Sequence, residues 1–420
     1  LLGLKSRDQW ILFAALTLIG VLAAGAAVWW NQRKKAAAEC DAGGAAQPLD
    51  SGDELARYLY DAETRLAAAR QLAHGTRFGN LPVIFIMGPQ GAAKTTNIVQ
   101  AGIEAELLAG QVFQDTQIVP TRFANIWFAR QAVFVEPARA VVDDKERWSS
   151  LIRRMQPGKL SSVVNRGSQA PRAAVVMFDC ERLYGSGGGG DLGGAARELH
   201  AQLREISQQL GIALPVYVLF TKLDRLPSFH EYVRTMQDAE AAQLLGAALP
   251  LPNANRGGSY EEEQTARINE AFNQIYYSLA DKRLEFLGRE NESGVPAAGY
   301  EFPRELRKLR TAMTRFLVDL CRPSQLSVGP FLRVFYFSGV RPVTVREAVQ
   351  APQRPARQNF DPTAGATAIF RPGQMQPAPA AAPELVTRRV PQWVFLRRLF
   401  SDVVLADDVG LRESGASVKT

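Results

Sequence analysis

Residues 81–96, LPVIFIMGPQGAAKTT, combine an apolar run, a glycine-rich turn and the triplet Lys-Thr-Thr. Gly88, Gly91, Lys94 and Thr95 occupy the places that the Walker A pattern gives to glycine, a flexible turn residue, lysine and a hydroxyl. The backbone N–H groups of such a loop surround a nucleotide's phosphates, and the lysine and the hydroxyl bind the terminal phosphates and Mg²⁺. The predicted nucleotide-binding residues of this loop are Gly88, Gly91, Ala93, Lys94, Thr95 and Thr96.

Ala93 departs from the pattern, because the residue before the lysine is normally glycine. The added methyl group is small, but the backbone amides of such a loop lie about 3 Å from phosphate oxygens. A loss of about 1.4 kcal/mol would weaken binding tenfold. Two interpretations therefore stay open, a working nucleotide site and one that has lost its activity.

A second motif follows the apolar run 215–220, where the chain continues as Thr221-Lys222-Leu223-Asp224. In GTP-binding folds a strand that ends in Asn-Lys-x-Asp recognises guanine. The aspartate accepts the two N–H donors of the base, the lysine stem covers the ring, and the first residue joins this loop to the phosphate loop. Alone, T-K-x-D could be any strand-end turn with solvated charges. Its place after a buried strand and downstream of a phosphate loop favours guanine recognition by Thr221, Lys222 and Asp224.

Glu136 is the candidate for the acidic residue that such folds place before the switch, in a D-x-x-G pattern. The stretch 133–139 reads VFVEPAR, so that Arg139 stands in place of the glycine. Arginine cannot adopt every backbone geometry open to glycine, and Pro137 stiffens the loop further. No obvious water-positioning residue follows, so weak or absent hydrolysis is expected. The predicted Mg²⁺ ligands are Thr95, Thr121 and Glu136.

Composition and charge argue against several other classes of protein. The chain has 420 residues, 46% of them apolar and 22% charged, which suits a folded protein with two domains of ordinary size plus linkers. The net charge of +7 is spread over the chain without a basic run interleaved with aromatics, so nucleic acid is not expected as a partner. The three cysteines and three histidines are isolated from one another, which argues against a disulfide framework and a zinc or iron site.

Residues 10–30, WILFAALTLIGVLAAGAAVWW, carry no charge and could cross a hydrocarbon core of about 30 Å as a helix. A cleaved signal peptide and a buried helix of a soluble domain are the alternatives. The run is long for a signal peptide, and no small-residue cleavage site follows it. The basic cluster Arg33-Lys34-Lys35 favours a membrane anchor with the bulk of the chain in the cytoplasm. Since the first residue is not Met, we expect the chain to be a segment of a longer protein.

The apolar runs 81–87, 173–178 and 215–220 read as buried strands, and an amphipathic helix at 192–210 lies between the last two. This order predicts parallel βαβ units and hence an α/β fold, a doubly wound, mainly parallel sheet of the P-loop GTPase-like type. Further expected elements are helices at 53–73, 94–109, 229–247, 261–288 and 301–321, and paired strands within 124–135. The segment 390–405 is expected to dock or to fold as a helix.

The predicted segments differ in composition. They are a transmembrane anchor at 1–35 with its helix at 10–30, a linker and connecting helix at 36–80, a GTPase-like α/β domain at 81–228, a helical extension at 229–349 with a returning strand at 332–337, a Pro/Ala-rich linker at 350–389 and a C-terminal docking segment at 390–420.

Taken in order, these features resemble the cytoplasmic N-terminal region of the IcmF/TssM family, the large inner-membrane component of the type VI secretion system. The likeness extends over nearly the whole chain. Its most specific parts are the T-K-x-D-x-x-P-x-F run at 221–229 and the closing F-L-R-x-L-F-x-D-V-V run at 395–404.

The resemblance implies a GTPase-like domain with a helical extension, located at the bacterial inner membrane with its bulk in the cytoplasm. It also implies oligomeric assembly with other type VI membrane-complex subunits and with baseplate components, and Mg²⁺ with GTP as a weakly bound cofactor. The family's phosphate loop normally ends in Gly-Lys-Thr and its switch in Asp-Thr-Ala-Gly. This chain departs at Ala93, Glu136, Pro137 and Arg139.

Three functions remain compatible with the sequence. The favoured one is a structural membrane-complex subunit whose GTPase-like domain is degenerate, because the departures gather at the switch while the base loop is kept. The second is an active Mg²⁺-dependent GTPase or ATPase that powers or switches assembly of the complex. The third is a membrane-bound targeting GTPase, which would need an intact D-x-x-G and shorter helical insertions.

Overall fold

The computed structural model describes residues 51–68, 76–111, 113–114, 117–118, 121–157, 170–184, 189–251, 259–289, 298–324, 328–349 and 384–415. Contacts divide the chain into two units, Leu1–Glu54 and Leu55–Thr420, and the description below concerns the second. The predicted membrane helix at 10–30 lies outside the described residues, as does the stretch 350–383 of the predicted linker. Within the described part of the chain, every helix is too short or too polar to cross a membrane.

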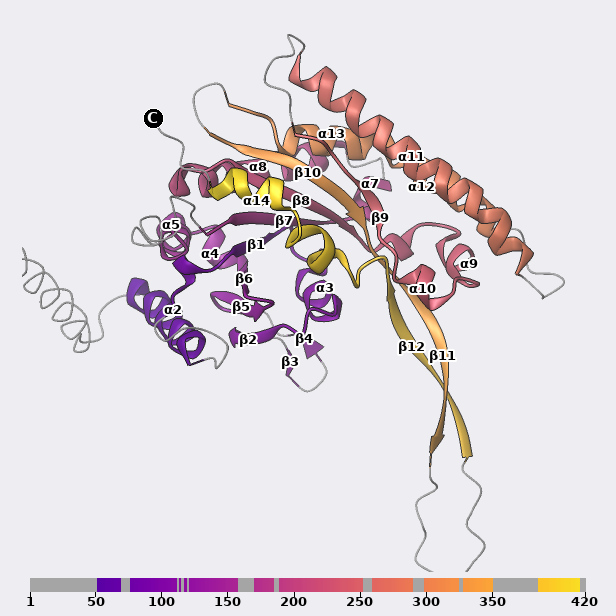
Figure 1. The fold of residues 1–420 in the computed structure, drawn as a ribbon, viewed down its shortest axis with the longest axis horizontal. Helices are drawn as coiled ribbons and strands as arrows, with labels where there is room; N and C mark the ends of the chain where they lie inside the picture. Colours follow the sequence, from indigo (N-terminus) through magenta and orange to yellow (C-terminus); the bar gives the residue numbers. More distant parts are fainter. Residues whose placement is uncertain are drawn as a thin grey trace, which may run out of the picture. The chain divides into compact units, whose positions relative to one another are not determined.

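An eight-stranded sheet lies at the centre of the second unit (Figure 1). In spatial order its strands are β2 (Glu106–Ala109), β5 (Ala124–Ala129), β6 (Ala132–Pro137), β1 (Val83–Met87), β7 (Arg172–Asp179), β8 (Leu214–Thr221), β10 (Pro330–Phe337) and β9 (Leu245–Ala248). The five strands from β6 to β10 run parallel, whereas β2, β5 and β9 pair antiparallel at the two sides. The fold is therefore α/β with a mostly parallel central sheet, as the sequence predicts.

Helices cover both faces of this sheet, which explains why its central strands are continuous apolar runs. On one face lie α2 (Ser51–Ala67), α5 (Lys145–Arg154), α7 (Cys180–Tyr184), α8 (Gly189–Leu210), α9 (Phe229–Val233), α11 (Tyr260–Gly288), α12 (Ala298–Lys308) and α13 (Arg310–Leu320). On the other lie α3 (Lys94–Gln100) and a π-helix at Leu399–Val404, with α14 (Asp408–Gly415) after it. Short helices also occur at Phe78–Asn80, α4 (Arg139–Val142), Leu223–Arg225 and α10 (Asp238–Ala241), and a small hairpin is formed by β3 (Phe113–Gln114) and β4 (Gln117–Ile118).

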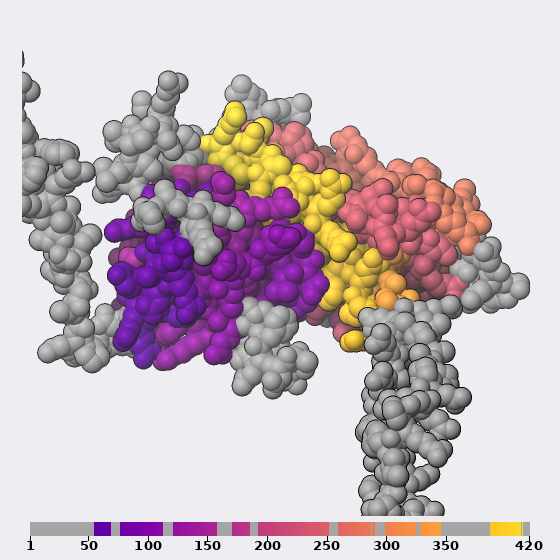
Figure 2. Space-filling view, turned by 60° about the horizontal axis from the view of Figure 1, so that its bottom comes forward, coloured from indigo at the N-terminus to yellow at the C-terminus, as the bar shows by residue number. Residues whose placement is uncertain are grey.

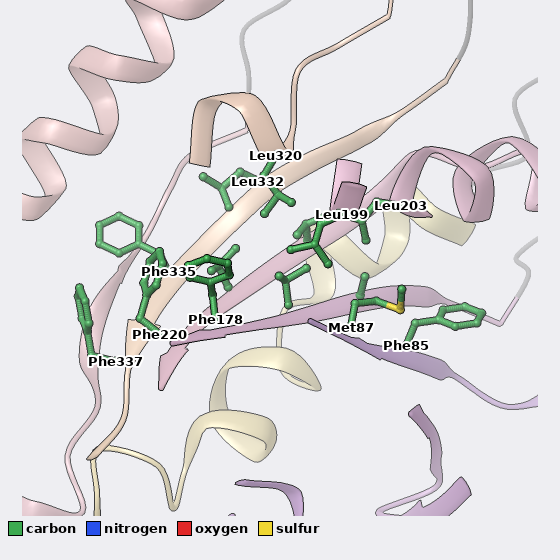
Figure 3. Close-up of a cluster of buried hydrophobic side chains, with 14 of the residues drawn as sticks. Phe85, Met87, Phe178, Leu199, Leu203, Phe220, Leu320, Leu332, Phe335 and Phe337 are labelled. Atoms are coloured by element: carbon green, nitrogen blue, oxygen red, sulfur yellow. The ribbon is translucent and has the colours of Figure 1, made fainter. Parts of the chain in front are cut away.

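Strand β1 shows how the two layers divide the core. Val83, Phe85 and Met87 belong to the cluster under α2, α5 and α8, whereas Ile84 and Ile86 belong to the cluster under α3 and the π-helix. Figure 3 shows the first cluster, in which side chains from the strands meet leucines of α8 and α13. Successive strand residues point to opposite faces, so both clusters are built on one sheet.

The predicted helix at 94–109 is wrong after Gln100. Gly102 and Glu104 have positive φ angles of 71° and 52°, which end α3, and the chain then forms the edge strand β2. The sequence of β2 is rich in helix formers, but Leu107 pairs with Trp127 of β5. Tertiary pairing overrides the local propensity here.

The predicted helix at 229–247 is likewise replaced by α9, α10 and β9, and the predicted helix at 301–321 is divided into α12 and α13 at Leu309. The helix predicted at 261–288 is confirmed as α11. Because β9 and β10 belong to the central sheet and α13 packs on α8, this region is part of the same core.

The predicted helix at 390–405 is wrong in its first half. Residues Glu384–Val394 form β12, which pairs along its whole length with β11 (Gly339–Val349) in an antiparallel ribbon that extends from the sheet (Figure 1). The π-helix that follows buries Leu399, Phe400 and Val404, and Phe400 meets the edge of Phe134 with ring centroids 5.5 Å apart. Figure 2 shows this C-terminal segment (yellow) lying between the N-terminal strands and the helices of the second half.

Asp407 fastens the end of the C-terminal segment to the sheet. Its carboxylate accepts hydrogen bonds from Nε and Nη2 of Arg333, both at 2.8 Å, and from the Tyr217 hydroxyl at 2.9 Å. Burial opposes ionisation, but the hydrogen bonds from Arg333, Gly410 and Tyr217 outweigh it and hold the pKa of Asp407 below its usual value. The segment that follows β12 is thus an integral part of the α/β unit.

Candidate nucleotide-binding site

The loop between β1 and α3 has the backbone geometry of a tight turn at the carboxyl end of the sheet. Gly88 has a φ of 140°, and a Cβ at this position would lie 2.2 Å from the carbonyl oxygen of Met177, so only glycine fits. Gly91 has a φ of 80°. Ala93 also lies in the left-handed region, with φ 57° and ψ 32°, where an L-residue is strained by about 1 kcal/mol. The departure at Ala93 therefore strains the backbone itself.

Lys94 lies across the loop that precedes it. Its ammonium donates hydrogen bonds to the carbonyl oxygens of Gly88 at 2.9 Å and of Pro89 at 3.0 Å. Burial lowers the pKa of Lys94, the carboxylate of Glu136 opposes this, and the charge of Arg139 lowers it further. The loop thus holds a cation at the place where a Walker A lysine meets phosphate.

The three predicted Mg²⁺ ligands lie together. The Thr95 hydroxyl donates to Glu136, with 2.9 Å between Oγ1 and Oε2. Asn125 Nδ2 donates to the same carboxylate at 3.2 Å, and the Thr121 hydroxyl donates to Asn125 Oδ1. Burial raises the pKa of Glu136, and the charge of Lys94 and the hydrogen bonds from Asn125 and Thr95 oppose this. Asn125, which no sequence motif singles out, completes this network of hydrogen bonds.

The oxygen atoms of this hydrogen-bond network suit a Mg²⁺ ion that is also bound by phosphates. Mg²⁺ is usually held by one or two carboxylates together with waters and substrate phosphates. Glu136 and the hydroxyl of Thr95 supply such oxygen atoms side by side. The part of the chain that the structure describes contains no cluster of three or more His, Cys, Asp or Glu residues that could hold a metal without a ligand. The donor set therefore fits a metal that arrives with phosphates.

A cavity of about 510 Å³ opens beside the loop. Its wall is made by the loop and the start of α3, by α4 with the residues before it, and by α8, which contributes Glu198, Leu199 and Gln202. Sequence reasoning missed these α8 residues, because nothing in the spacing of a long amphipathic helix says which turn faces the loop. All the predicted loop and metal residues line the cavity, namely Gly88, Gly91, Ala93, Lys94, Thr95, Thr96, Thr121 and Glu136.

The predicted base loop lies next to the phosphate loop but outside this cavity. The buried Thr221 hydroxyl donates to the carbonyl oxygen of Ala92 at 3.1 Å, which is the link between the two loops that the motif predicts. Lys222 pairs with Asp179 at 2.7 Å, and Asp224 Oδ1 accepts the backbone N–H of Val340 at 3.1 Å. None of the three motif residues is among those lining the cavity, so the structure joins the two loops without showing a shared pocket.

The lowered pKa of Lys94 predicts a pH dependence for phosphate binding. Phosphate binds the protonated ammonium, so affinity should be full at neutral pH and should fall as the pH rises through the depressed pKa, earlier than for an exposed lysine. Calorimetric titration with Mg²⁺-GTP between pH 7 and pH 10 measures this fall. The Lys94→Arg variant, whose guanidinium stays charged, should keep its own neutral-pH affinity over the range. An equal fall in both proteins would contradict the assignment.

Comparison with known proteins matches this chain to a protein family. Residues 143–417 match the model of the IcmF-related N-terminal domain. The chain is 26% identical over 269 residues to the type VI secretion system component TssM1 of Pseudomonas aeruginosa, an alignment that covers 61% of this chain and 23% of that protein.

Solved structures of GTP-binding proteins also overlap with the chain, though only loosely. A signal recognition particle receptor SRb-GTP/SRX complex from Chaetomium thermophilum shares 15% identity over 34% of this chain and 70% of its own, with a TM-score of 0.21. The small COPII coat GTPase SAR1 from Encephalitozoon cuniculi, in complex with GDP, shares 12% over 63% of this chain and 90% of its own, with a TM-score of 0.22. Overlaps of this size decide nothing about the fold or the site. The family match spans more than half of the chain, and this protein belongs to the IcmF-related N-terminal domain family.

Proposed function

We propose that the chain is a structural component of a type VI secretion membrane complex, with a degenerate GTPase-like domain that binds Mg²⁺-nucleotide weakly and docks other secretion subunits. The family match and the TssM1 relative support the secretion role. The single observation that carries the nucleotide part is the meeting of Lys94, Thr95 and Glu136 at one cavity. These groups supply the cation and the oxygen ligands that a Mg²⁺-phosphate pair requires.

The same site explains why we expect weak binding and negligible turnover. Ala93 strains the loop, and Asp224 is already hydrogen-bonded to Val340. At the switch, Pro137 restricts the backbone, and Arg139 occupies the place of the glycine. The alternative is an active Mg²⁺-dependent GTPase or ATPase that drives assembly, and the intact contact between Thr95 and Glu136 is the observation in its favour.

Guanine selectivity tests the base loop. Replacing Asp224 by asparagine should abolish any preference for GTP over ATP, because the amide no longer accepts both N–H donors of guanine. Its remaining oxygen can still accept the N–H of Val340, so the fold should persist. Competition between the two Mg²⁺-nucleotides, with the exposed Asp281→Asn as control, measures the preference. A preference that survives in Asp224→Asn would remove the base loop from the site.

For location and partners, we propose an inner-membrane anchor at 10–30, with the bulk of the chain in the cytoplasm facing the other membrane-complex subunits and the baseplate. Helix α11 is the proposed docking element. Its side chains Tyr277 and Leu284 are 62% and 68% exposed and lie two turns apart on one face. Exposed apolar side chains of this kind occur singly on many surfaces, but a pair aligned on one helix suits a partner helix or groove.

Replacing Tyr277 and Leu284 together by aspartate should reduce co-purification of the other secretion subunits from detergent extracts, without lowering the stability of the chain. The matched control is Tyr60→Asp on α2, because Tyr60 is equally exposed at 63%. Unchanged retention of every subunit by the double variant would rule out α11 as the docking element.

A further inference from the structure

Arg139 has been considered so far only as the replacement for the switch glycine, although it also lines the cavity. It is the first residue of α4, three residues after Glu136. Its Nε donates to the Asp143 carboxylate at 2.9 Å, and its Nη2 lies 3.1 Å from Oε1 of Glu198 on α8. The side chains of all three residues are about half exposed. Exposed ion pairs of this kind contribute little to stability, so a stronger anion can replace them.

The charges that line the cavity show which cation is available to a ligand. They are two cations, Lys94 and Arg139, and two carboxylates, Glu136 and Glu198. Lys94 lies over the loop carbonyls, where a Walker A lysine binds the β- and γ-phosphates, and Glu136 holds the Thr95 hydroxyl, where the metal would lie. Both cations line the same cavity. The half-exposed guanidinium of Arg139 is therefore a second cation available to the terminal phosphate.

We propose that Arg139 binds the terminal phosphate of a nucleoside triphosphate and that this residue makes the site distinguish triphosphate from diphosphate. The inference rests on the proposed nucleotide site. A phosphate accepts two parallel N–H bonds from a guanidinium, and such charge-assisted bonds are roughly twice as strong as neutral ones. The terminal phosphate then competes with Glu198 for Arg139.

The same exchange links the ligand to α8. When Arg139 turns to phosphate, Glu198 loses its partner on α4, and the amide of Gln202, 3.5 Å from Glu198, keeps a contact within α8 only. The ion pair between α4 and α8 is thus expected to be present without triphosphate and broken when triphosphate is bound. Arginine at this position replaces the backbone contact of the missing switch glycine by a side-chain contact.

Calorimetric titration of the full chain with Mg²⁺-GDP and with Mg²⁺-bound non-hydrolysable GTP tests the proposal. Arg139→Ala should weaken triphosphate binding by about tenfold and change diphosphate binding by less than about twofold. Glu198→Gln, which removes the competing carboxylate, should strengthen triphosphate binding by about threefold. The control is Arg153→Ala, an exposed arginine of α5 whose guanidinium contacts Ser149.

The outcomes separate this inference from the function on which it rests. If both nucleotides bind and Arg139→Ala leaves their affinity ratio unchanged, or weakens both equally, the role of Arg139 is wrong and the nucleotide site stands. If the unaltered chain binds neither nucleotide, both are wrong. Thermal unfolding of each variant shows that the exposed substitutions leave the fold intact.

Discussion

Arg172→Ala is expected to lower the free energy of unfolding by about 4 kcal/mol, more than any other single substitution considered for this chain. Arg172 begins β7 and is completely buried. Its guanidinium donates to the backbone carbonyl oxygens of Met155 and Leu81, both at 2.8 Å, and of Gly79 at 3.2 Å. Truncation would leave these buried carbonyl groups without donors and would open a cavity beneath α5.

Within the part of the chain that the structure describes, the hydrogen-bond acceptors of the Arg172 guanidinium are all backbone carbonyl oxygens. Burial lowers the pKa of Arg172 to about 9, so it keeps its proton at pH 7 in the folded and the unfolded chain. No proton is exchanged on unfolding at neutral pH, so the measured loss there reports the hydrogen bonds and the packing, less the cost of burying the charge. Urea unfolding followed by circular dichroism measures the difference in the free energy of unfolding. The control is Arg182→Ala at an exposed position of α7, which should lower this free energy by less than about 0.5 kcal/mol. A loss below about 1 kcal/mol for Arg172→Ala would contradict this role.

Lys94→Ala is expected to reduce Mg²⁺-GTP affinity by about 100-fold, which is about 2.7 kcal/mol. The size follows from the loss of charge-assisted hydrogen bonds to phosphate at a half-buried site. The substitution should leave the fold unchanged, since within the described part of the chain the ammonium donates its hydrogen bonds to the carbonyl groups of Gly88 and Pro89 on the cavity wall. Titration of both proteins measures the ratio, and exposed Lys282→Ala on α11 is the control. A reduction of less than about threefold would show that nucleotide, if bound, does not use this loop.

The buried parallel strands and the phosphate loop could be predicted from the sequence, because both depend on local patterns. Continuous apolar runs identify β1, β7 and β8, and the glycine spacing identifies the turn that only Gly88 can make. The meeting of Thr95 with Glu136 also follows, since the loop after β1 and the end of β6 lie at the same edge of the sheet.

The elements that could not be predicted depend on pairing between distant segments. Strand β2 is composed of helix formers and exists because β5 lies beside it. Strand β12 pairs with β11 across residues 350–383, and no local pattern gives that register. Asn125 was missed although it lies directly opposite Glu136 in the β5–β6 hairpin, a register that the sequence could have suggested. Glu198 reaches the cavity from α8, which only the packing of that helix determines.

The proposed degenerate site is tested most directly by measuring Mg²⁺-GTP binding and phosphate release together on the full chain. We predict saturable binding no tighter than micromolar, weakened about 100-fold in Lys94→Ala, with phosphate release no faster than in buffer. Sustained phosphate release by the unaltered chain that disappears in Lys94→Ala would contradict the proposal and identify the domain as an active NTPase.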